Sequence, residues 1–181
     1  MSAQADPFAI LTDIARRSRT MAAGLPEQEE AAELWNGIGF ILAGQRYIAS
    51  MGEVVEILHV PRYTRVPGVR PFLLGAANVR GRLLPLIDLA HFFDLPRSAR
   101  SSRERRVLVI EQGDIFSGLV VDSVAGMQYF AADNFVAAPQ DTPASVQPFV
   151  QGGFERNKEV WKVFSTVELV GDERFLDVAQ W

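Results

Sequence analysis

Acid–base chemistry has one candidate place in this sequence, the segment around His91. His91 lies between Asp88 and Asp94, and a histidine beside carboxylates is a common arrangement for a general base. The segment also contains two phenylalanines, and a single histidine near aromatic rings more often packs or faces solvent than transfers protons. The other histidine, His59, stands alone. An enzyme that uses Asp88, His91 and Asp94 stays open as an alternative, which loss of activity in His91→Ala would support, but we expect no catalytic residues.

Metal, nucleophile and phosphate chemistry find even less support. The chain has no cysteine, which excludes both disulfides and cysteine-based metal sites, and neither histidine has a second histidine at ligand spacing. The pair Gly152-Gly153 is not followed by the Lys-Ser/Thr of a phosphate loop, and no Gly-x-Ser-x-Gly elbow occurs. We therefore expect no metal and no cofactor.

A charged turn next to an apolar strand is the more informative feature. Asn78, Arg80 and Gly81 form a polar turn in which the glycine can adopt a positive φ. The following run, Leu83–Leu89, has the length of a buried strand, and Ala90–Leu95 has the pattern of one or two helical turns. Such a turn holds one cation at the surface. The alternative is that Arg80 forms a surface salt bridge, worth about 0–1 kcal/mol.

Composition bounds the class of protein. The 181 residues are 48% hydrophobic and 22% charged, as in a globular protein of one domain or two small modules. The net charge of −4 argues against a nucleic-acid-binding protein. No secretory signal is visible, and no apolar run approaches the ~20 residues of a membrane-spanning helix. We expect a soluble, cytoplasmic protein without direct membrane insertion.

The N-terminal residues predict helix. Apolar residues recur at helical spacing over residues 6–23, with Asp6 as N-cap and Gly24 at the C-terminal end. This amphipathic helix is expected to pack on its own domain, with docking on a partner as the alternative; binding to a membrane surface is the weakest option, because its arginines are few and an acidic stretch follows. The acidic stretch Glu27–Glu33 follows as a second helix or a linker.

From Ile38 onward the pattern changes to short strands in two groups that resemble each other. The expected strands are Gly39–Ala43, Gln45–Ser50 and Val54–Leu58, and then Val107–Glu111, Ile115–Val121 and Val124–Phe130. Laid over one another without gaps, the groups place Gly44 on Gly113 and Leu58 on Met127, and further along Gly75 parallels Gly152. An internal duplication of a small five-stranded unit is indicated. Short strands with glycine at the turns favour two small closed barrels.

At this point the sequence resembles a known family. Asn78-Val79-Arg80-Gly81, followed by Leu84-Pro85-Leu86-Ile87-Asp88-Leu89, is similar to the signature of CheW-like proteins, in which leucine is usual at the second position. The lead-in Thr64–Gly68 matches as well, and the resemblance covers roughly residues 36–170. It implies two SH3-like β-barrel subdomains, each five-stranded, with a groove between them, so the expected fold is mainly β with an N-terminal helical extension.

The resemblance also implies a non-catalytic function. CheW-like proteins are adaptors that couple chemoreceptors to a histidine kinase. They bind the regulatory domain of a CheA-type kinase through hydrophobic barrel surfaces, and they hold the cytoplasmic tip of a methyl-accepting chemoreceptor in the groove. The adaptor is then associated with membrane receptor arrays through its partners alone.

Matching the motif residue by residue assigns the expected receptor-binding residues. Arg80 is the main candidate for the receptor contact. Gly75, Asn78 and Gly81 are expected to act through backbone geometry, since a side chain at either glycine would block close approach. Val54, on a strand expected to line the same groove, is a second-tier candidate.

The expected domain organisation follows from these patterns. Residues 1–36 form the helical extension, residues 37–175 the CheW-like domain of two intertwined barrels, and residues 176–181 a tail. The arginine-rich segment 97–106 is expected to be a solvated loop, or a basic patch if the protein is a scaffold for anionic partners.

The long N-terminal segment is unusual for the family. The runs Ala23–Pro26 and Trp35–Phe40 resemble the adaptor of the type IV pilus chemosensory system, which implies control of twitching motility. An adaptor of a flagellar chemotaxis pathway and a structural scaffold without a signalling role are the alternatives.

Overall fold

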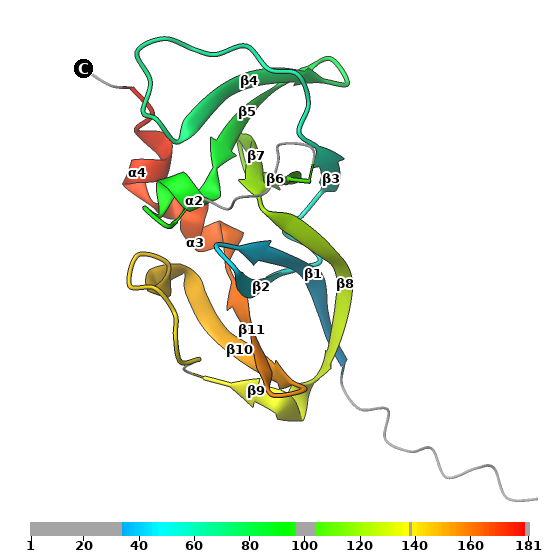
Figure 1. Ribbon diagram of the computed structural model, residues 1–181. Coiled ribbons are helices and arrows are strands. Elements are labelled where there is room, and N and C mark those ends of the chain that lie inside the picture. The colour runs from blue at the N-terminus through cyan, green and yellow to red at the C-terminus, as the bar shows by residue number, and fades with distance from the viewer. Residues whose placement is uncertain (1–33, 97–103, 138, 180–181) are drawn as a thin grey trace, which may run out of the picture. The chain divides into compact units, whose positions relative to one another are not determined.

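The computed structural model describes residues 34–96, 104–137 and 139–179 (Figure 1). The predicted helix over residues 6–23, the acidic stretch 27–33 and residues 97–103 of the arginine-rich segment lie outside the described residues. The chain divides into two units before Leu34. Strand β1 begins there, three residues earlier than the predicted domain start, because Trp35 already packs on Phe154 with the ring centroids 5.0 Å apart.

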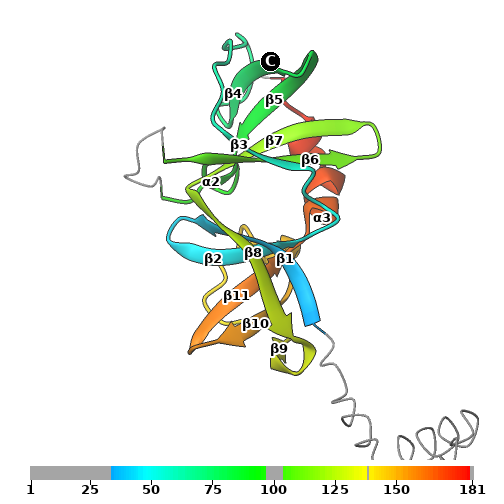
Figure 2. The same cartoon turned by 90° about the vertical axis from the view of Figure 1, so that its right-hand side faces the viewer.

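Eleven strands in the described residues form two sheets. The six-stranded sheet has the order β8 (Ser123–Ala131), β1 (Leu34–Leu42), β2 (Gln45–Ser50), β11 (Glu159–Phe164), β10 (Val150–Arg156), β9 (Phe135–Val136). The five-stranded sheet has the order β3 (Glu56–His59), β6 (Arg106–Gln112), β7 (Ile115–Val121), β5 (Arg82–Asp88), β4 (Leu73–Val79). Both sheets are strongly curled, as the prediction of two small barrels requires (Figures 1 and 2).

Helical segments are short. Within the described residues they are α2 (Leu89–Phe92), α3 (Thr166–Gly171), α4 (Glu173–Leu176) and two 3-10 turns, η1 (Ala132–Asn134) and η2 (Gln147–Phe149). Helix α2 directly follows β5, helix α3 follows β11, and each of the two begins at a side-chain cap. Asp88 caps α2 and Ser165 caps α3.

The strand order shows an internal duplication in which the two copies exchange hairpins. In each sheet an antiparallel hairpin lies between one edge strand and a parallel neighbour from the other copy: β2 pairs with β11, and β7 pairs with β5. The chain therefore crosses between the sheets after β2 and again after β7. The second half of the predicted duplication is confirmed, because Gly75 and Gly152 occupy equivalent bulges with φ values of 148° and 152°.

The gapless overlay of the first half is one residue out of register. Hairpin β1–β2 closes with Leu42 opposite Gln45, and hairpin β6–β7 closes with Gln112 opposite Ile115. Gly113 thus corresponds to Ala43 and not to Gly44. The error arises because glycine suits both positions of a two-residue hairpin turn, so the glycines alone do not set the register.

Three apolar clusters make up the core. The central cluster lies between the sheets and includes Phe40, Tyr47, Ile87, Leu119, Phe164 and Phe175. A second cluster fills the curl of the five-stranded sheet and includes Leu84, Leu86, Val107 and Val109. A third fills the curl of the six-stranded sheet and includes Ile48, Phe130, Phe154 and Trp161.

Because both faces of several strands are covered, these strands are continuous apolar runs. On β6, Leu108 and Ile110 join the central cluster, while Val107 and Val109 face into the curl.

The C-terminal residues join the two sheets. Helix α3 continues from β11 of the six-stranded sheet, and α4 then buries Phe175 in the central cluster. Beyond α4, Ala179 forms an antiparallel bridge to Val69, in the loop that leads to β4 of the five-stranded sheet. The described residues of the predicted tail, 176–179, are thus packed against the domain.

Candidate functional site

The polar turn predicted from the sequence is the tip of the β4–β5 hairpin. Val79 pairs with Arg82, which leaves Arg80 and Gly81 as a two-residue turn with φ values of 52° and 81°. Positive φ at both positions is the turn geometry that matches the twist of paired strands. The Asn78 Oδ1 atom accepts a hydrogen bond from the Gly81 backbone N–H at 2.9 Å. The sequence predicted the turn and the glycine, but not the left-handed conformation of Arg80.

Arg80 projects from this tip and forms an ion pair. Its Nη2 atom lies 2.5 Å from Oε1 of Glu56, the first residue of β3. The side chain of Arg80 is 77% exposed and that of Glu56 is 26% exposed. An exposed pair of this kind contributes about 0–1 kcal/mol to stability. The salt bridge considered from the sequence is therefore present, and it still leaves the guanidinium open to a partner.

Gly75, at the other end of β4, has a role inside the fold. Its φ of 148° is unfavourable for other residues, and an added Cβ would lie 2.2 Å from the carbonyl oxygen of Thr64. Thr64 and Ala76 exchange two backbone hydrogen bonds of 2.9 Å, which join the segment after β3 to β4. Gly75 thus permits the two edges of the five-stranded sheet to meet. A Cβ added at Gly81, by contrast, would have no described atom within 4 Å.

Val54 does not lie on the hairpin. It precedes β3, is half-buried, and packs against the central cluster, two residues before Glu56. Its neighbours Val55 and Ile57 are the exposed apolar side chains of this region. Sequence reasoning missed them because Val55 and Ile57 are apolar and Glu56 lies on the opposite face, so the residue types in this strand do not indicate which face is exposed.

The equivalent strand of the other copy has the same character. Ile57 on β3 pairs with Leu108, and Met127 on β8 pairs with Ile38, so Ile57 and Met127 are equivalent positions. Met127 and its neighbour Tyr129 are also exposed. Both strands follow directly after a crossing of the chain between the sheets. Exposed apolar side chains thus lie at both crossings.

Beside the tip, Arg82 and Leu83 complete the hairpin surface. The Arg82 guanidinium binds Glu111 at 2.8 Å and lies 3.8 Å from the ring centre of Phe116. This shared hydrogen bond raises the pKa of Arg82 and lowers the pKa of Glu111. Leu83, opposite Asn78 on the hairpin, is 69% exposed, the largest exposure among the large apolar side chains described.

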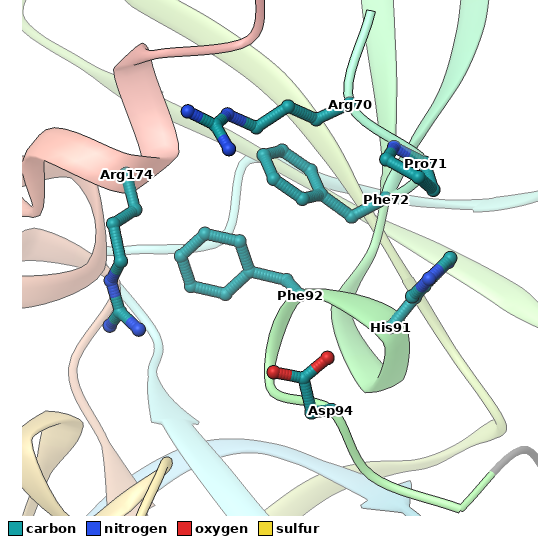
Figure 3. A pocket seen from close by; sticks show the side chains of 7 residues that line it. All are labelled: Arg70, Pro71, Phe72, His91, Phe92, Asp94 and Arg174. Atoms are coloured by element: carbon teal, nitrogen blue, oxygen red, sulfur yellow. The ribbon is translucent and has the colours of Figure 1, made fainter. Parts of the chain in front are cut away.

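The fold separates the three residues considered as an acid–base group, because Asp88 is buried away from His91 and Asp94. The Asp88 carboxylate is buried, accepts a hydrogen bond from the His91 backbone N–H at 3.2 Å, and binds Arg105 at 3.0 Å. Asp88 thus caps α2 and fixes the start of β6, whereas His91 and Asp94 line a surface cavity (Figure 3). Arg105 belongs to the arginine-rich segment, and its ion pair with Asp88 gives it a structural role.

Neither a metal site nor a membrane-spanning helix is found among the residues that the structure describes. In the described part of the chain, no three histidine, cysteine, aspartate or glutamate side chains come together as a metal site would require. None of the helices described has the length and apolar character that a membrane crossing requires.

Comparison with known proteins decides the family. Residues 36–174 match the model of the CheW-like domain. The chain belongs to the CheW-like family. It is 49% identical to the protein PilI of Pseudomonas aeruginosa over 179 residues, which cover 99% of both chains. It is 33% identical to the chemotaxis protein CheW of Helicobacter pylori, over 62% of this chain and 67% of that protein.

The fold of the family is found in solved structures as well. A crystal structure of the scaffolding protein TtCheW from Thermoanaerobacter tengcongensis superposes with a TM-score of 0.62 over 72% of this chain and 88% of that chain, at 23% identity. The CheW-like fold predicted from the motif is confirmed. The resemblance to the pilus branch of the family, predicted from residues near the N-terminus, agrees with the identity to PilI along nearly the whole chain.

Proposed function

We propose that this CheW-like protein is a non-catalytic adaptor that couples a methyl-accepting chemoreceptor to a CheA-type histidine kinase in a pathway that controls type IV pili. The proposal rests on the 49% identity with PilI. The match extends over 99% of both chains, so it includes the N-terminal segment that a minimal adaptor lacks. Control of twitching motility follows from the same relative. The buried, ion-paired state of Asp88 further supports a role without catalysis.

Arg80 is the proposed receptor contact. The turn fixes its backbone, the Asn78 hydrogen bond fixes the turn, and the guanidinium is 77% exposed. A rigid, exposed cation at a hairpin tip binds a carboxylate or backbone carbonyl on a partner with little loss of conformational entropy. Asn78 and Gly81 belong to this site through the turn, and Gly75 through the closure of the sheet.

The exposed apolar side chains supply a second element of the proposed interface. Val55 just before β3 and Ile57 on β3, together with Met127 and Tyr129 on β8, lie at the two crossings between the barrels. A helical receptor tip presents apolar side chains at intervals of three and four residues, which such a surface would bury. Val54 supports this surface from beneath through its packing on the central cluster.

The adaptor proposal is tested by affinity purification of the tagged full chain from its own cells, with mass spectrometry of the bound proteins. Recovery of both a multidomain histidine kinase and a methyl-accepting receptor is the expected result. Recovery of neither under gentle conditions would leave a likeness of fold alone, and would favour the scaffold alternative.

The role of Arg80 is tested by Arg80→Ala in the same experiment, with Arg82→Ala as the matched control. Both arginines are exposed and ion-paired on one hairpin, so each change costs at most about 1 kcal/mol of stability. Arg80→Ala is expected to lose the receptor and keep the kinase, while Arg82→Ala keeps both. Equal receptor recovery with the two variants would contradict the assignment.

The choice between pathways is tested by deletion of the gene. Loss of twitching with normal swimming chemotaxis is expected. The reverse phenotype would assign the protein to a flagellar pathway.

A further inference from the structure

The outer side of the β4–β5 hairpin carries exposed apolar side chains. Ala77 and Leu84 lie opposite one another and point into the second cluster, so their neighbours along each strand face away from it. Leu83, one of these neighbours, is 69% exposed. Thr64 joins the same side of the sheet, because it forms an antiparallel bridge to Ala76, the neighbour of Ala77 (Figure 1). The hairpin surface thus continues onto the segment after β3.

The segment after β3 presents a cation and an apolar side chain on this side. Tyr63 packs against the second cluster, so Arg62 and Thr64, on either side of it, face outward. Val66 follows in the same alternation and is 41% exposed, and Arg62 is exposed as well. We define the outer face as the side chains of Arg62, Val66, Ala76, Asn78, Leu83 and Pro85.

Arg62 and Leu83 are close enough for one short peptide segment to reach both. The register of the Thr64–Ala76 bridge directs Arg62 towards Asn78, and Leu83 is paired with Asn78. Two strand spacings, about 10 Å, therefore separate the backbones of Arg62 and Leu83. An extended chain covers this distance in about three residues.

The charges around the outer face are unbalanced. The stretch from Ile57 to Ile87 contains five arginines and no acidic residue. Three of these arginines bind carboxylates from outside the stretch: Arg70 binds Asp177, Arg80 binds Glu56, and Arg82 binds Glu111. The other two, Arg62 and Arg65, form no ion pair and no hydrogen bond through their side chains within the described parts of the chain. Two positive charges thus remain without a counter-charge.

The combination of few charges with apolar side chains decides between the possible anionic partners. Nucleic acid is bound by proteins with many cations and a basic surface, and this chain has a net charge of −4. Anionic membrane surfaces are bound by clusters of about four to eight basic residues. Two unpaired arginines beside an exposed leucine and valine instead match a protein segment in which carboxylates adjoin apolar side chains.

We propose that the outer face binds an acidic segment of a partner protein, with an apolar side chain on Leu83 and a carboxylate on Arg62. Arg80 already shares the carboxylate of Glu56, whereas Arg62 loses no internal ion pair when it binds a partner. The outer face adjoins the Arg80 turn and makes its contacts through other side chains. The inference therefore goes beyond the receptor contact proposed above, since it assigns a separate surface and the chemistry of its occupant.

The test is a titration of the ¹⁵N-labelled full chain with the capped peptide acetyl-Glu-Glu-Leu-Leu-amide, followed by NMR. We expect saturable shifts centred on the residues of the outer face. The neutral analogue acetyl-Gln-Gln-Leu-Leu-amide is expected to bind about three- to tenfold more weakly, and acetyl-Lys-Lys-Leu-Leu-amide weakest of all. The proposal is overturned if no saturable shifts appear on the outer face up to about 5 mM peptide, or if the lysine peptide binds as well as the acidic one.

Single substitutions on the outer face separate the charged contact from the apolar one. Arg62→Gln is expected to weaken binding of the acidic peptide about three- to fivefold and to leave the neutral peptide unchanged. Leu83→Ser is expected to weaken binding of both peptides, because both place a leucine on this side chain.

Each substitution has a matched control elsewhere on the surface. Arg46→Gln changes an exposed arginine of β2 in the other sheet, and Leu176→Ser changes an exposed leucine of α4. Both controls are expected to bind the peptides as the unchanged chain does. Equal binding by Arg62→Gln and Arg46→Gln, or by Leu83→Ser and Leu176→Ser, would contradict the proposal. The titration uses the purified chain alone, so its outcome is independent of receptor and kinase recovery.

Discussion

At the scale of single residues, the motif that identifies the family combines three different physical roles. Gly75 permits the close approach of two backbone segments, Gly81 permits a positive φ in an open turn, and Arg80 presents a charge. The two glycines are equally plausible as receptor-site residues from sequence. Their surroundings separate them, because an added side chain would collide with Thr64 at Gly75 and would meet no described atom at Gly81.

This difference predicts unequal costs of substitution. Gly75→Ala is expected to lower the free energy of unfolding by about 2–4 kcal/mol, through backbone strain and overlap with the Thr64 carbonyl. Gly81→Ala is the matched control and is expected to cost about 1–2 kcal/mol, because it adds strain alone. Urea denaturation followed by circular dichroism measures both. Equal losses would show that the closure at Thr64 relaxes freely.

At the scale of secondary-structure elements, the C-terminal segment from Thr166 to Ala179 connects the two sheets, and we call it the clasp. It leaves the six-stranded sheet through α3, buries Phe175 of α4 in the central cluster, and ends in a bridge to Val69 of the five-stranded sheet. A segment this short has no stability as an isolated helix, so its structure depends on the packing of Phe175. The same clasp places Arg174 at the surface cavity that His91 and Asp94 line.

Phe175→Ala is therefore expected to destabilise the domain by about 3–5 kcal/mol, the usual cost of removing a buried aromatic side chain. Leu176→Ala, one residue along the same helix, is the control. Leu176 is exposed, and its loss is expected to change stability by less than about 0.5 kcal/mol. Thermal or urea unfolding of the two variants measures both changes in stability. A small effect of Phe175→Ala would mean that the clasp contributes little to the core.

At the scale of the whole described unit, two curled sheets share one core, and we therefore expect them to unfold together. The central cluster draws side chains from both, including Phe40 and Phe164 from one sheet and Ile87 and Leu119 from the other. The exchange of hairpins between the two copies adds to this, since each sheet contains strands from both. Cooperative unfolding of the two sheets follows.

Hydrogen exchange provides the measurement. Phe164→Ala, in the central cluster, is expected to lower the opening free energy of amides in β1, β2, β6 and β7 by the same amount, about 3–5 kcal/mol. Selective loss of protection in the six-stranded sheet would show that the two sheets open as separate units.

Much of the fold could be predicted because it depends on local sequence patterns. Strand positions, the turn at Gly81 and the motif around Arg80 follow from alternation, glycine and the family signature. The register between the duplicated hairpins could not be predicted, because glycine fits either position of a two-residue hairpin turn. The family resemblance led us to expect intertwined barrels, but local patterns could not show which hairpins are exchanged, because strands buried on both faces show no alternation that identifies their neighbours.

By itself, the sequence determined the family, the mainly β architecture and the presence of a charged turn, since each rests on residues close together in the chain. The tertiary structure alone decided that Glu56 is the partner of Arg80, that Val55 and Ile57 rather than Val54 are exposed, and that residues near 70, 92 and 174 enclose a cavity. These features depend on contacts between segments far apart in sequence. Such contacts are set by how the sheets curl and pack, and no local pattern records them.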